Sequence, residues 1–228
     1  MSGLKRPIAV LFDLDGTLID SAPDLIATLN RLRVDRGLTP LAAASVRHLA
    51  STGARGLVQG GFPGADQRLT AQLVERFLTD YRENLWQDSR PFAGIEQLLS
   101  ELEQRGMKWG VVTNKVSGLA RPTLQAAGWL ERAGCLVAGD STPEPKPSPQ
   151  PVREACRLLG CRPDQAWFVG DDERDVMAGR SAGTATIVAS WGYLPPDQSG
   201  RDWGADCVID QPLQVLELMA SSSGVIHG

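Results

Sequence analysis

The sequence predicts an α/β fold, a Rossmann-like parallel sheet core with an inserted α-helical cap domain. Short, continuous apolar runs recur along the chain, as is typical of strands that are buried on both faces of a parallel sheet. Helical stretches separate most of these runs. After the first run comes a gap of about 90 residues that contains helical patterns but no convincing strand, which indicates an insertion.

The apolar runs define the expected core. Strands are predicted at residues 8–12, 109–113, 135–138, 166–169, 186–189 and 207–209. Helices are predicted at roughly residues 94–105, 118–127, 149–159, 173–182 and 212–220. This alternation favours right-handed crossovers, with helices covering both faces of the sheet.

The long gap predicts the cap. Ser21-Ala22-Pro23-Asp24 is typical of a helix start, with Ser21 as the N-cap and Pro23 in the first turn. Further helical patterns cover about 42–50, 53–60 and 67–86. We therefore expect a helical cap domain at residues 21–87 and a catalytic core formed by residues 1–20 and 88–228.

Composition restricts the class of protein. The net charge of -4 gives no broad cationic field, so neither nucleic acid nor a membrane surface is an expected partner. The first apolar run is too short for a signal peptide or a membrane span. Four cysteines without CxxC spacing and two histidines do not predict a zinc site or a disulfide framework. A cytoplasmic protein with reduced thiols is expected.

Two carboxylates follow the first predicted strand. Asp13 and Asp15 are two residues apart, so on a strand they point the same way, roughly 6.5–7 Å apart along the chain. They leave the carboxyl end of the strand, where α/β sheets place their ligands, and Gly16 then allows the chain to turn. A lone DxD of this kind would be read as an ordinary acidic turn.

The surrounding residues carry a more specific signal. The run Phe12–Asp24 reads FDLDGTLIDSAPD, and it resembles the haloacid dehalogenase superfamily, in particular its phosphoglycolate phosphatase group. Three further motifs of that family appear in order: Val111-Val112-Thr113-Asn114-Lys115, then Lys146-Pro147, then Val169-Gly170-Asp171-Asp172-Glu173-Arg174-Asp175. The resemblance covers nearly the whole chain.

The resemblance implies a Mg²⁺-dependent phosphatase that forms an aspartyl-phosphate intermediate. In this reading Asp13 is the nucleophile, and Asp15 protonates the leaving oxygen and later activates water. The metal ligands are Asp13, the backbone carbonyl of Asp15, and Asp171, which suit a hard cation that prefers oxygen. Because a phosphomonoester repels a carboxylate, positive charge must gather at the site before attack.

The other motif residues have implied roles around the phosphoryl group. Thr113 and the Asn114 amide donate hydrogen bonds to the transferring oxygens, and Lys146 neutralises the phosphoryl charge. Taken alone, Thr113 would be a strand-end hydroxyl and Lys146 a solvated loop lysine. Gly16, Thr17, Asp172 and Asp175 are expected to support the site. Asp175 is expected to orient Lys146 or a metal-bound water, whereas the role of Asp172 is open because many relatives carry Ser or Thr there.

The cap is expected to set the substrate. No lysine lies between Leu18 and Met107, which argues against the related phosphonate hydrolases, because these need a cap lysine. Leu25 stands where the related β-phosphoglucomutases carry histidine, and Asp15 argues against haloacid dehalogenases. Arg55 is the candidate for binding the non-phosphate end of the substrate. The alternative is that Arg55 is a solvated helix arginine, which is also what we expect of Arg47.

The expected partner is a small phosphorylated metabolite. Phosphoglycolate phosphatase-like activity is the main prediction, and an N-acetylmuramic acid 6-phosphate phosphatase of cell-wall recycling is the alternative. A sugar phosphomutase and a non-catalytic binding protein on the same fold are weaker alternatives. A monomer or a homodimer is expected.

Overall fold

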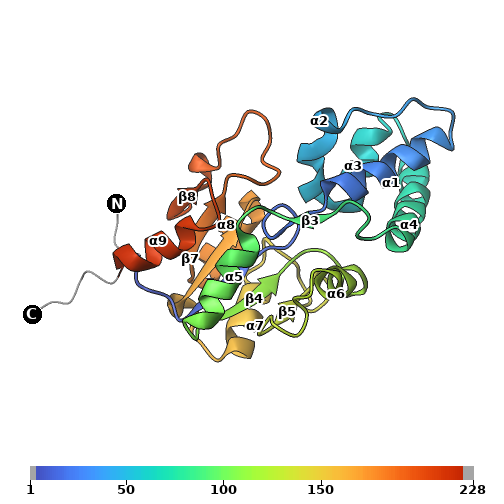
Figure 1. Ribbon diagram of the computed structural model, residues 1–228. Helices are drawn as coiled ribbons and strands as arrows, with labels where there is room; N and C mark the ends of the chain where they lie inside the picture. Colours follow the sequence, from blue (N-terminus) through green and yellow to red (C-terminus); the bar gives the residue numbers. More distant parts are fainter. Residues whose placement is uncertain (1–3, 223–228) are drawn as a thin grey trace, which may run out of the picture.

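A six-stranded parallel sheet forms the core of the computed structural model, which describes residues 4–222 (Figure 1). The strand order is β5-β4-β1-β6-β7-β8. The bounds are β1 Ala9–Phe12, β4 Lys108–Val112, β5 Leu136–Val137, β6 Ala166–Gly170, β7 Ala185–Ala189 and β8 Cys207–Ile209. This confirms the predicted α/β class with a parallel sheet, and every predicted core strand is present.

Helices cover both faces of this sheet. The core helices are α5 Ile95–Gln104, α6 Ser117–Ala126, α7 Gln150–Leu159, α8 Glu173–Ala182 and α9 Gln214–Ser221. Side chains alternate along β1, so Val10 and Phe12 pack in one hydrophobic cluster with α5, α6 and α9. Ala9 and Leu11 point the other way and pack in a second cluster with α7 and α8. Burial on both faces explains why β1 reads as a continuous apolar run.

The inserted segment is helical and packs around a hydrophobic cluster of its own (Figure 1). Its helices are α1 Ala22–Val34, α2 Ala43–Val46, the 3-10 helix η1 Arg47–Thr52, α3 Gly53–Gly61 and α4 Gln67–Glu83. Leu29, Leu57 and Phe77, from three of these helices, are fully buried in that cluster. The α1–α4 group lies to one side of the sheet and joins the core near β3.

Two helix predictions are wrong in detail. The expected helix at 42–50 is only one turn, α2, and continues as the 3-10 helix η1, where the Ser51 and Thr52 hydroxyls donate to carbonyls three residues back. The expected helix at 67–86 ends at Glu83. Beyond it, the buried Asp24 carboxylate accepts the backbone N–H groups of Gln87, Asp88 and Ser89, which draws the chain away from the helix axis.

A short antiparallel ladder, absent from the sequence prediction, joins the insert to the core. Strand β2, Ile19–Asp20, pairs with β3, Arg90–Pro91, where the chain leaves the core and returns to it. Two-residue strands carry no hydrophobic pattern that a sequence reading can detect. The ladder places the two connections side by side.

Helix α1 begins where predicted, but a different group caps it. Ser21 occupies the N-cap position, and its side chain makes no capping bond. Instead, the Tyr193 hydroxyl accepts the backbone N–H groups of Ser21 (2.7 Å) and Ala22 (2.9 Å) and donates to Asp20 Oδ1 (2.9 Å). Tyr193, which lies beyond β7, therefore satisfies two of the free backbone donors at the start of α1.

Replacing Tyr193 by Phe should lower the free energy of unfolding by roughly 1–3 kcal/mol, because two buried N–H donors lose their acceptor. Urea unfolding of both proteins measures the change. Metal affinity should stay the same, because the contact of Tyr193 with Asp171 is through its backbone N–H. An unchanged urea midpoint would show that water replaces the hydroxyl at no cost.

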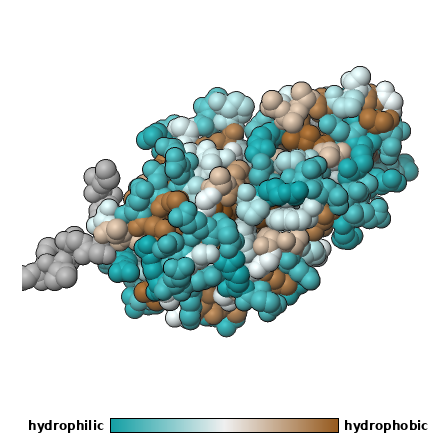
Figure 2. Space-filling view, in the orientation of Figure 1, coloured by the Kyte–Doolittle hydropathy of each residue, from teal (hydrophilic) through white to brown (hydrophobic). Residues whose placement is uncertain are grey.

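The surface is mostly hydrophilic, with hydrophobic residues scattered among polar ones on the face shown in Figure 2. Within residues 4–222, no helix is both long enough and apolar enough to span a membrane.

Candidate active site

Three adjacent strand ends bring the predicted site together. Asp13 directly follows β1, Thr113 follows β4 and Asp171 follows β6. Since β1 lies between β4 and β6 in the sheet, these side chains meet at one point of its carboxyl edge. The register holds Asp13 in place, because its backbone N–H donates to the Val169 carbonyl (2.9 Å).

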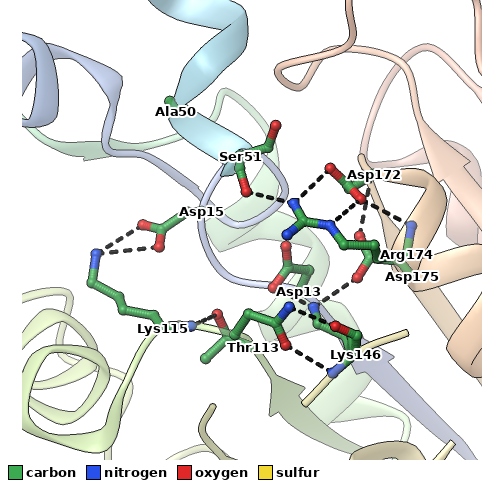
Figure 3. A pocket seen from close by; sticks show the side chains of 11 residues that line it. Asp13, Asp15, Ala50, Ser51, Thr113, Lys115, Lys146, Asp172, Arg174 and Asp175 are labelled. Carbon is green, nitrogen blue, oxygen red and sulfur yellow. Dashed lines mark hydrogen bonds and ion pairs between the residues drawn. The ribbon is translucent and has the colours of Figure 1, made fainter. Parts of the chain in front are cut away.

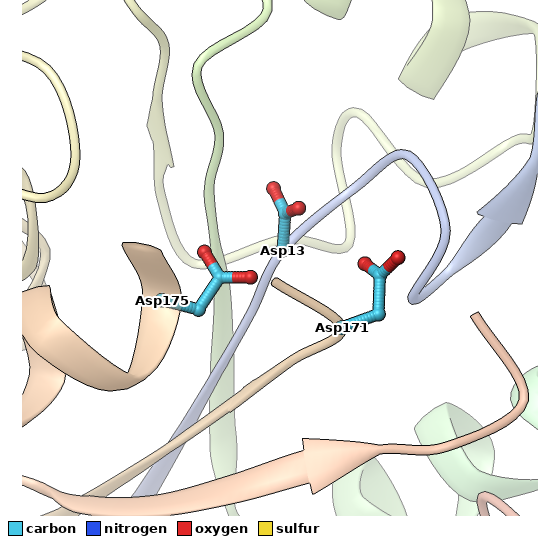
Figure 4. A group of neighbouring side chains, drawn as sticks. All are labelled: Asp13, Asp171 and Asp175. Carbon is cyan, nitrogen blue, oxygen red and sulfur yellow. The ribbon is translucent and has the colours of Figure 1, made fainter. Parts of the chain in front are cut away.

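Asp13, Asp171 and Asp175 form a carboxylate cluster, with one oxygen of each within 4.8 Å of the others (Figure 4). Asp171 is buried and accepts hydrogen bonds from Thr17 Oγ1 (2.9 Å) and the Tyr193 backbone N–H (2.8 Å). Burial and the neighbouring charges of Asp13 and Asp175 nevertheless raise the pKa of Asp171 well above its usual value. This concentration of negative charge calls for a cation.

Gly16 makes the close packing around Asp171 possible. Its φ is +88°, and a Cβ at this position would lie 2.1 Å from Asp171 Oδ2. Any other residue would displace this carboxylate, so the glycine has a positional role beyond the turn itself.

Lys146 supplies positive charge to the cluster from the loop before α7. Its Nζ lies 2.8 Å from Asp13 Oδ1 and 2.6 Å from Asp175 Oδ1, and it also donates to the Val112 carbonyl (2.8 Å). These carboxylates raise the pKa of Lys146 despite its burial, so the ammonium stays charged. Burial raises the pKa of Asp175 to about 7, against the opposing effect of Lys146.

The Asn114 side chain fixes the backbone of Lys146. Its Nδ2 donates to the Lys146 carbonyl and its Oδ1 accepts the Lys146 N–H, both at 2.9 Å. Both polar atoms of the Asn114 side chain are therefore engaged by the Lys146 backbone. Thr113 Oγ1 accepts the Lys115 N–H (3.1 Å) and lines the same pocket.

Asp172 and Asp175 take separate positions at the start of α8. Asp172 caps the helix through the Arg174 N–H and pairs with the Arg174 guanidinium through both carboxylate oxygens. Asp175 faces Lys146. Arg174 also donates to the Ser51 carbonyl of η1 (2.6 Å), so it bridges the core and the inserted helices.

Asp15 lies at the same edge of the sheet, and its partner is Lys115. The Lys115 ammonium donates to Asp15 Oδ1 (2.9 Å), Asp15 Oδ2 (3.2 Å) and the Tyr81 hydroxyl of α4 (2.9 Å). This contact also crosses from the core to the inserted helices.

These residues line one small pocket of about 40 Å³ (Figure 3). It contains Asp13, Asp15, Ala50, Ser51, Thr113, Asn114, Lys115, Lys146, Asp172, Arg174 and Asp175. Asp171 is buried and does not line this pocket, but its carboxylate lies within 4.8 Å of those of Asp13 and Asp175. The structure thus brings together all of the predicted site residues except Arg55.

Arg55 is exposed on α3 and lines neither this pocket nor the neighbouring one. Its role in substrate binding stays a prediction. Arg47, expected to be solvated, instead pairs with Asp20 (2.8 Å) and lies over the Tyr193 ring, 5.1 Å from its centroid. This ion pair links η1 to Asp20 of β2, where the chain passes from the core into the insert.

Sequence reasoning missed Lys115, Arg174 and Tyr81. Lys115 lies in the second motif and Arg174 in the fourth. A positively charged residue next to the predicted site residues could therefore have been predicted to line the site. Tyr81 had none, because in sequence it is one aromatic residue on the buried face of a helix.

The donor set fits a divalent metal ion. The cluster offers carboxylate oxygens, which hard cations prefer. The Lys146 ammonium pairs with two of its three members, Asp13 and Asp175. Burial and the neighbouring carboxylates Asp13 and Asp175 raise the pKa of Asp171, and a bound cation would offset both effects. Asp13 and Asp171 would hold the ion, with Asp175 beside them.

Comparison with known proteins agrees with this geometry. The family model for haloacid dehalogenase-like hydrolases matches residues 10–189. The chain is 42% identical over 212 residues to an N-acetylmuramic acid 6-phosphate phosphatase from Pseudomonas aeruginosa. The alignment covers 92% of this chain and 94% of that protein. The chain is also 42% identical over 214 residues to a phosphoglycolate phosphatase from Xanthomonas campestris pv. campestris, covering 94% and 97%.

A solved structure shares the architecture. The crystal structure of a predicted phosphoglycolate phosphatase from Haemophilus somnus 129PT superposes with a TM-score of 0.84 at 29% identity. The superposition covers 95% of this chain and 99% of the other.

A parallel α/β core with helices inserted after its first strand, and with carboxylates and a buried lysine at its carboxyl edge, defines a class of hydrolase. The chain belongs to the haloacid dehalogenase-like hydrolase family. The predicted resemblance and the predicted enzyme class, a phosphatase that hydrolyses phosphoric monoesters, are thereby confirmed. Phosphatases of this family use a divalent metal, which agrees with the carboxylate cluster.

Proposed function

We propose that this protein is a Mg²⁺-dependent phosphatase that transfers phosphate from a small phosphomonoester of the phosphoglycolate type to Asp13 and then to water. One observation carries the proposal. The Asp13 carboxylate lines a small pocket of about 40 Å³, with Lys146 paired to it and two further carboxylates, Asp171 and Asp175, beside it. A nucleophile, a counter-charge and a set of metal ligands therefore converge on one phosphoryl group.

Mg²⁺ bound by Asp13, Asp171 and the backbone carbonyl of Asp15 would supply the positive charge that lets a carboxylate approach a phosphate dianion. Lys146 adds to that charge, and Asp175 orients Lys146 through its 2.6 Å contact. Thr113 Oγ1 and the Asn114 backbone N–H donate to the oxygens of the transferring phosphoryl group.

Asp15 serves as the general acid and base. Its carboxylate lies on the open side of the pocket, next to the neighbouring cavity in which the leaving group would sit. It protonates the departing oxygen, and the resulting carboxylate then takes a proton from the water that attacks the phosphoryl group on Asp13.

Residues 21–87 act as the cap, and residues 1–20 and 88–228 as the catalytic core. The inserted helices have their own hydrophobic cluster, and the β2–β3 ladder holds the two connections. Contacts such as Arg174 to Ser51 close the pocket from the side of the cap. Arg55 is exposed on α3 and lines neither cavity. We propose that it contacts the non-phosphate end of the substrate when the cap closes.

N-acetylmuramic acid 6-phosphate is the second candidate substrate, because a phosphatase named for it is as similar to this chain as one named for phosphoglycolate. Turnover of both esters with Mg²⁺, alongside p-nitrophenyl phosphate, tests the proposal. A kcat/KM for 2-phosphoglycolate at least tenfold above that for the amino-sugar ester supports the first candidate, and the reverse ratio supports the second. No turnover of any phosphomonoester would refute the proposal.

The carboxylate cluster makes a prediction about pH. In metal-free protein, the free energy of unfolding should fall by roughly 1–3 kcal/mol between about pH 5.5 and about pH 8. Burial raises the pKa values of Asp171 and Asp175, so the folded protein retains protons that the unfolded chain has already lost. This stabilisation is fully present below the unfolded pKa, near about 4, and disappears as pH passes the folded values.

Urea unfolding at the two pH values, with a chelator or with saturating Mg²⁺, measures this effect. The cation should largely remove the fall, because it compensates the ionised carboxylates. A metal-free stability that rises over the same interval would contradict the account.

A further inference from the structure

Lys115 is a buried cation that the proposed mechanism leaves without a role. Its side chain is 6% exposed, and its ammonium contacts the Asp15 carboxylate and the Tyr81 hydroxyl. Asp15 belongs to the core and Tyr81 to α4, so Lys115 lies where the two parts meet. Removing a lysine ammonium from water is costly, so a burial of this kind needs a partner or a function.

Lys115 also borders a second cavity. This cavity, of about 240 Å³, adjoins the phosphoryl pocket and shares Asp15, Asn114 and Lys115 with it. The rest of its wall is Leu25, Ala54, Phe77, Leu78, Tyr81, Val116 and Leu119. The larger, mainly apolar cavity is therefore the space beside the phosphoryl pocket in which the organic part of a substrate would lie.

Charge singles out Lys115 within this cavity. Of the described residues that line it, Lys115 is the cation. Lys146 and Arg174 line the phosphoryl pocket but not this cavity, whereas Lys115 lines both. An anionic group on the leaving part of a substrate would therefore meet Lys115 and the Tyr81 hydroxyl.

We propose that Lys115 is the specificity-determining residue and binds a carboxylate on the organic part of the substrate. This inference rests on the proposed phosphatase function. The carboxylate must lie close to the ester, because Lys115 is one hydrogen bond from Asp15, and Asp15 is itself the donor to the ester oxygen. A short phosphorylated hydroxy acid fits this spacing. In a large sugar ester, the acid group lies many bonds from the phosphate.

The test compares two esters with the same two-carbon chain, 2-phosphoglycolate and ethyl phosphate. Both have a primary alkoxide leaving group that needs a proton, and they differ in that a carboxylate replaces a methyl group. The parent protein should prefer 2-phosphoglycolate in kcat/KM by at least tenfold. In Lys115→Met, this preference should shrink by roughly 10- to 150-fold, the value of a hydrogen bond to a charged group.

Two further variants keep the test decisive. Lys115→Arg retains the charge and should retain most of the preference, even if Lys115→Met folds poorly. Lys108→Met is the matched control. Lys108 lies at the start of β4, at the opposite end of the strand from the site, and donates to the Leu159 carbonyl of α7. The preference of this variant for 2-phosphoglycolate should equal that of the parent.

The outcomes separate the possibilities. If the kcat/KM of Lys115→Met falls equally for both esters and their ratio is unchanged, Lys115 positions Asp15 and the inference is overturned. Equal kcat/KM values of the parent protein for ethyl phosphate and 2-phosphoglycolate would also overturn the inference. If the parent hydrolyses no phosphomonoester, including p-nitrophenyl phosphate, the proposed function itself fails.

Discussion

Asp13→Asn should lower kcat by roughly 10⁴-fold or more, the order of loss seen when a covalent nucleophile is removed. An amide is a far poorer nucleophile than a carboxylate, and no other carboxylate at this site is in its place. Asp171 is buried and does not line the pocket, and Asp175 is held against Lys146. Initial rates with 2-phosphoglycolate and with p-nitrophenyl phosphate measure the loss, which should be the same for both esters.

The fold of Asp13→Asn should be intact. Its melting temperature without metal should equal or exceed that of the parent, because one member of a mutually repelling cluster has lost its charge. Lys146 keeps Asp175 as its ion-pair partner, so the substitution leaves no buried ammonium unpaired. Asp164→Asn is a matched control on the surface, since Asp164 pairs with the exposed Arg162 away from the site, and it should keep full activity. Turnover of Asp13→Asn within tenfold of the parent would refute covalent catalysis by Asp13.

Lys146→Met should lose both activity and stability. Methionine keeps the length of the side chain but leaves Asp13 and Asp175 without their counter-charge, and breaking a buried ion pair costs about 3–5 kcal/mol. We expect kcat to fall roughly 10³-fold, because the transferring phosphoryl group loses a fixed cation. Urea unfolding and initial rates measure the two effects.

The two effects of Lys146→Met can be separated. The loss of stability should be smaller at low pH, where Asp171 and Asp175 hold protons, and saturating Mg²⁺ should recover part of it. Activity should not recover, because the metal does not replace Lys146. If the variant is as stable as the parent near neutral pH, Lys146 does not balance the cluster.

Much of the fold was predictable because its strands are buried on both faces. Residues in β1 such as Val10 and Leu11 pack against helices on opposite sides of the sheet, so the strand has to be apolar throughout. The order of strands then places Asp13, Thr113 and Asp171 at one edge of the sheet. The sequence motifs had already identified these three residues as site candidates. Their distances and protonation came only from the structure.

The features that escaped prediction depend on contacts between residues far apart in sequence. The Tyr193 hydroxyl caps α1 from about 170 residues away, and Asp24 ends α4 by binding the N–H groups beyond it. Tyr81 reads as an ordinary core aromatic on α4, and only the packing of α4 against the core brings it to Lys115. Local propensity and periodicity contain no information about such pairs.

The central claim is that Asp13 carries the phosphoryl group, and trapping that group tests it most directly. Asp15→Asn should still accept phosphate from p-nitrophenyl phosphate, whose leaving group needs no proton, but should lose the base that activates water. Mixing this variant with p-nitrophenyl phosphate and Mg²⁺, quenching with acid and reducing with borohydride should convert Asp13 to homoserine, which peptide mass spectrometry detects. The account predicts a burst of about one equivalent of nitrophenolate, with modification confined to Asp13. A burst with Asp13 unmodified, or with the label on another residue, would contradict it.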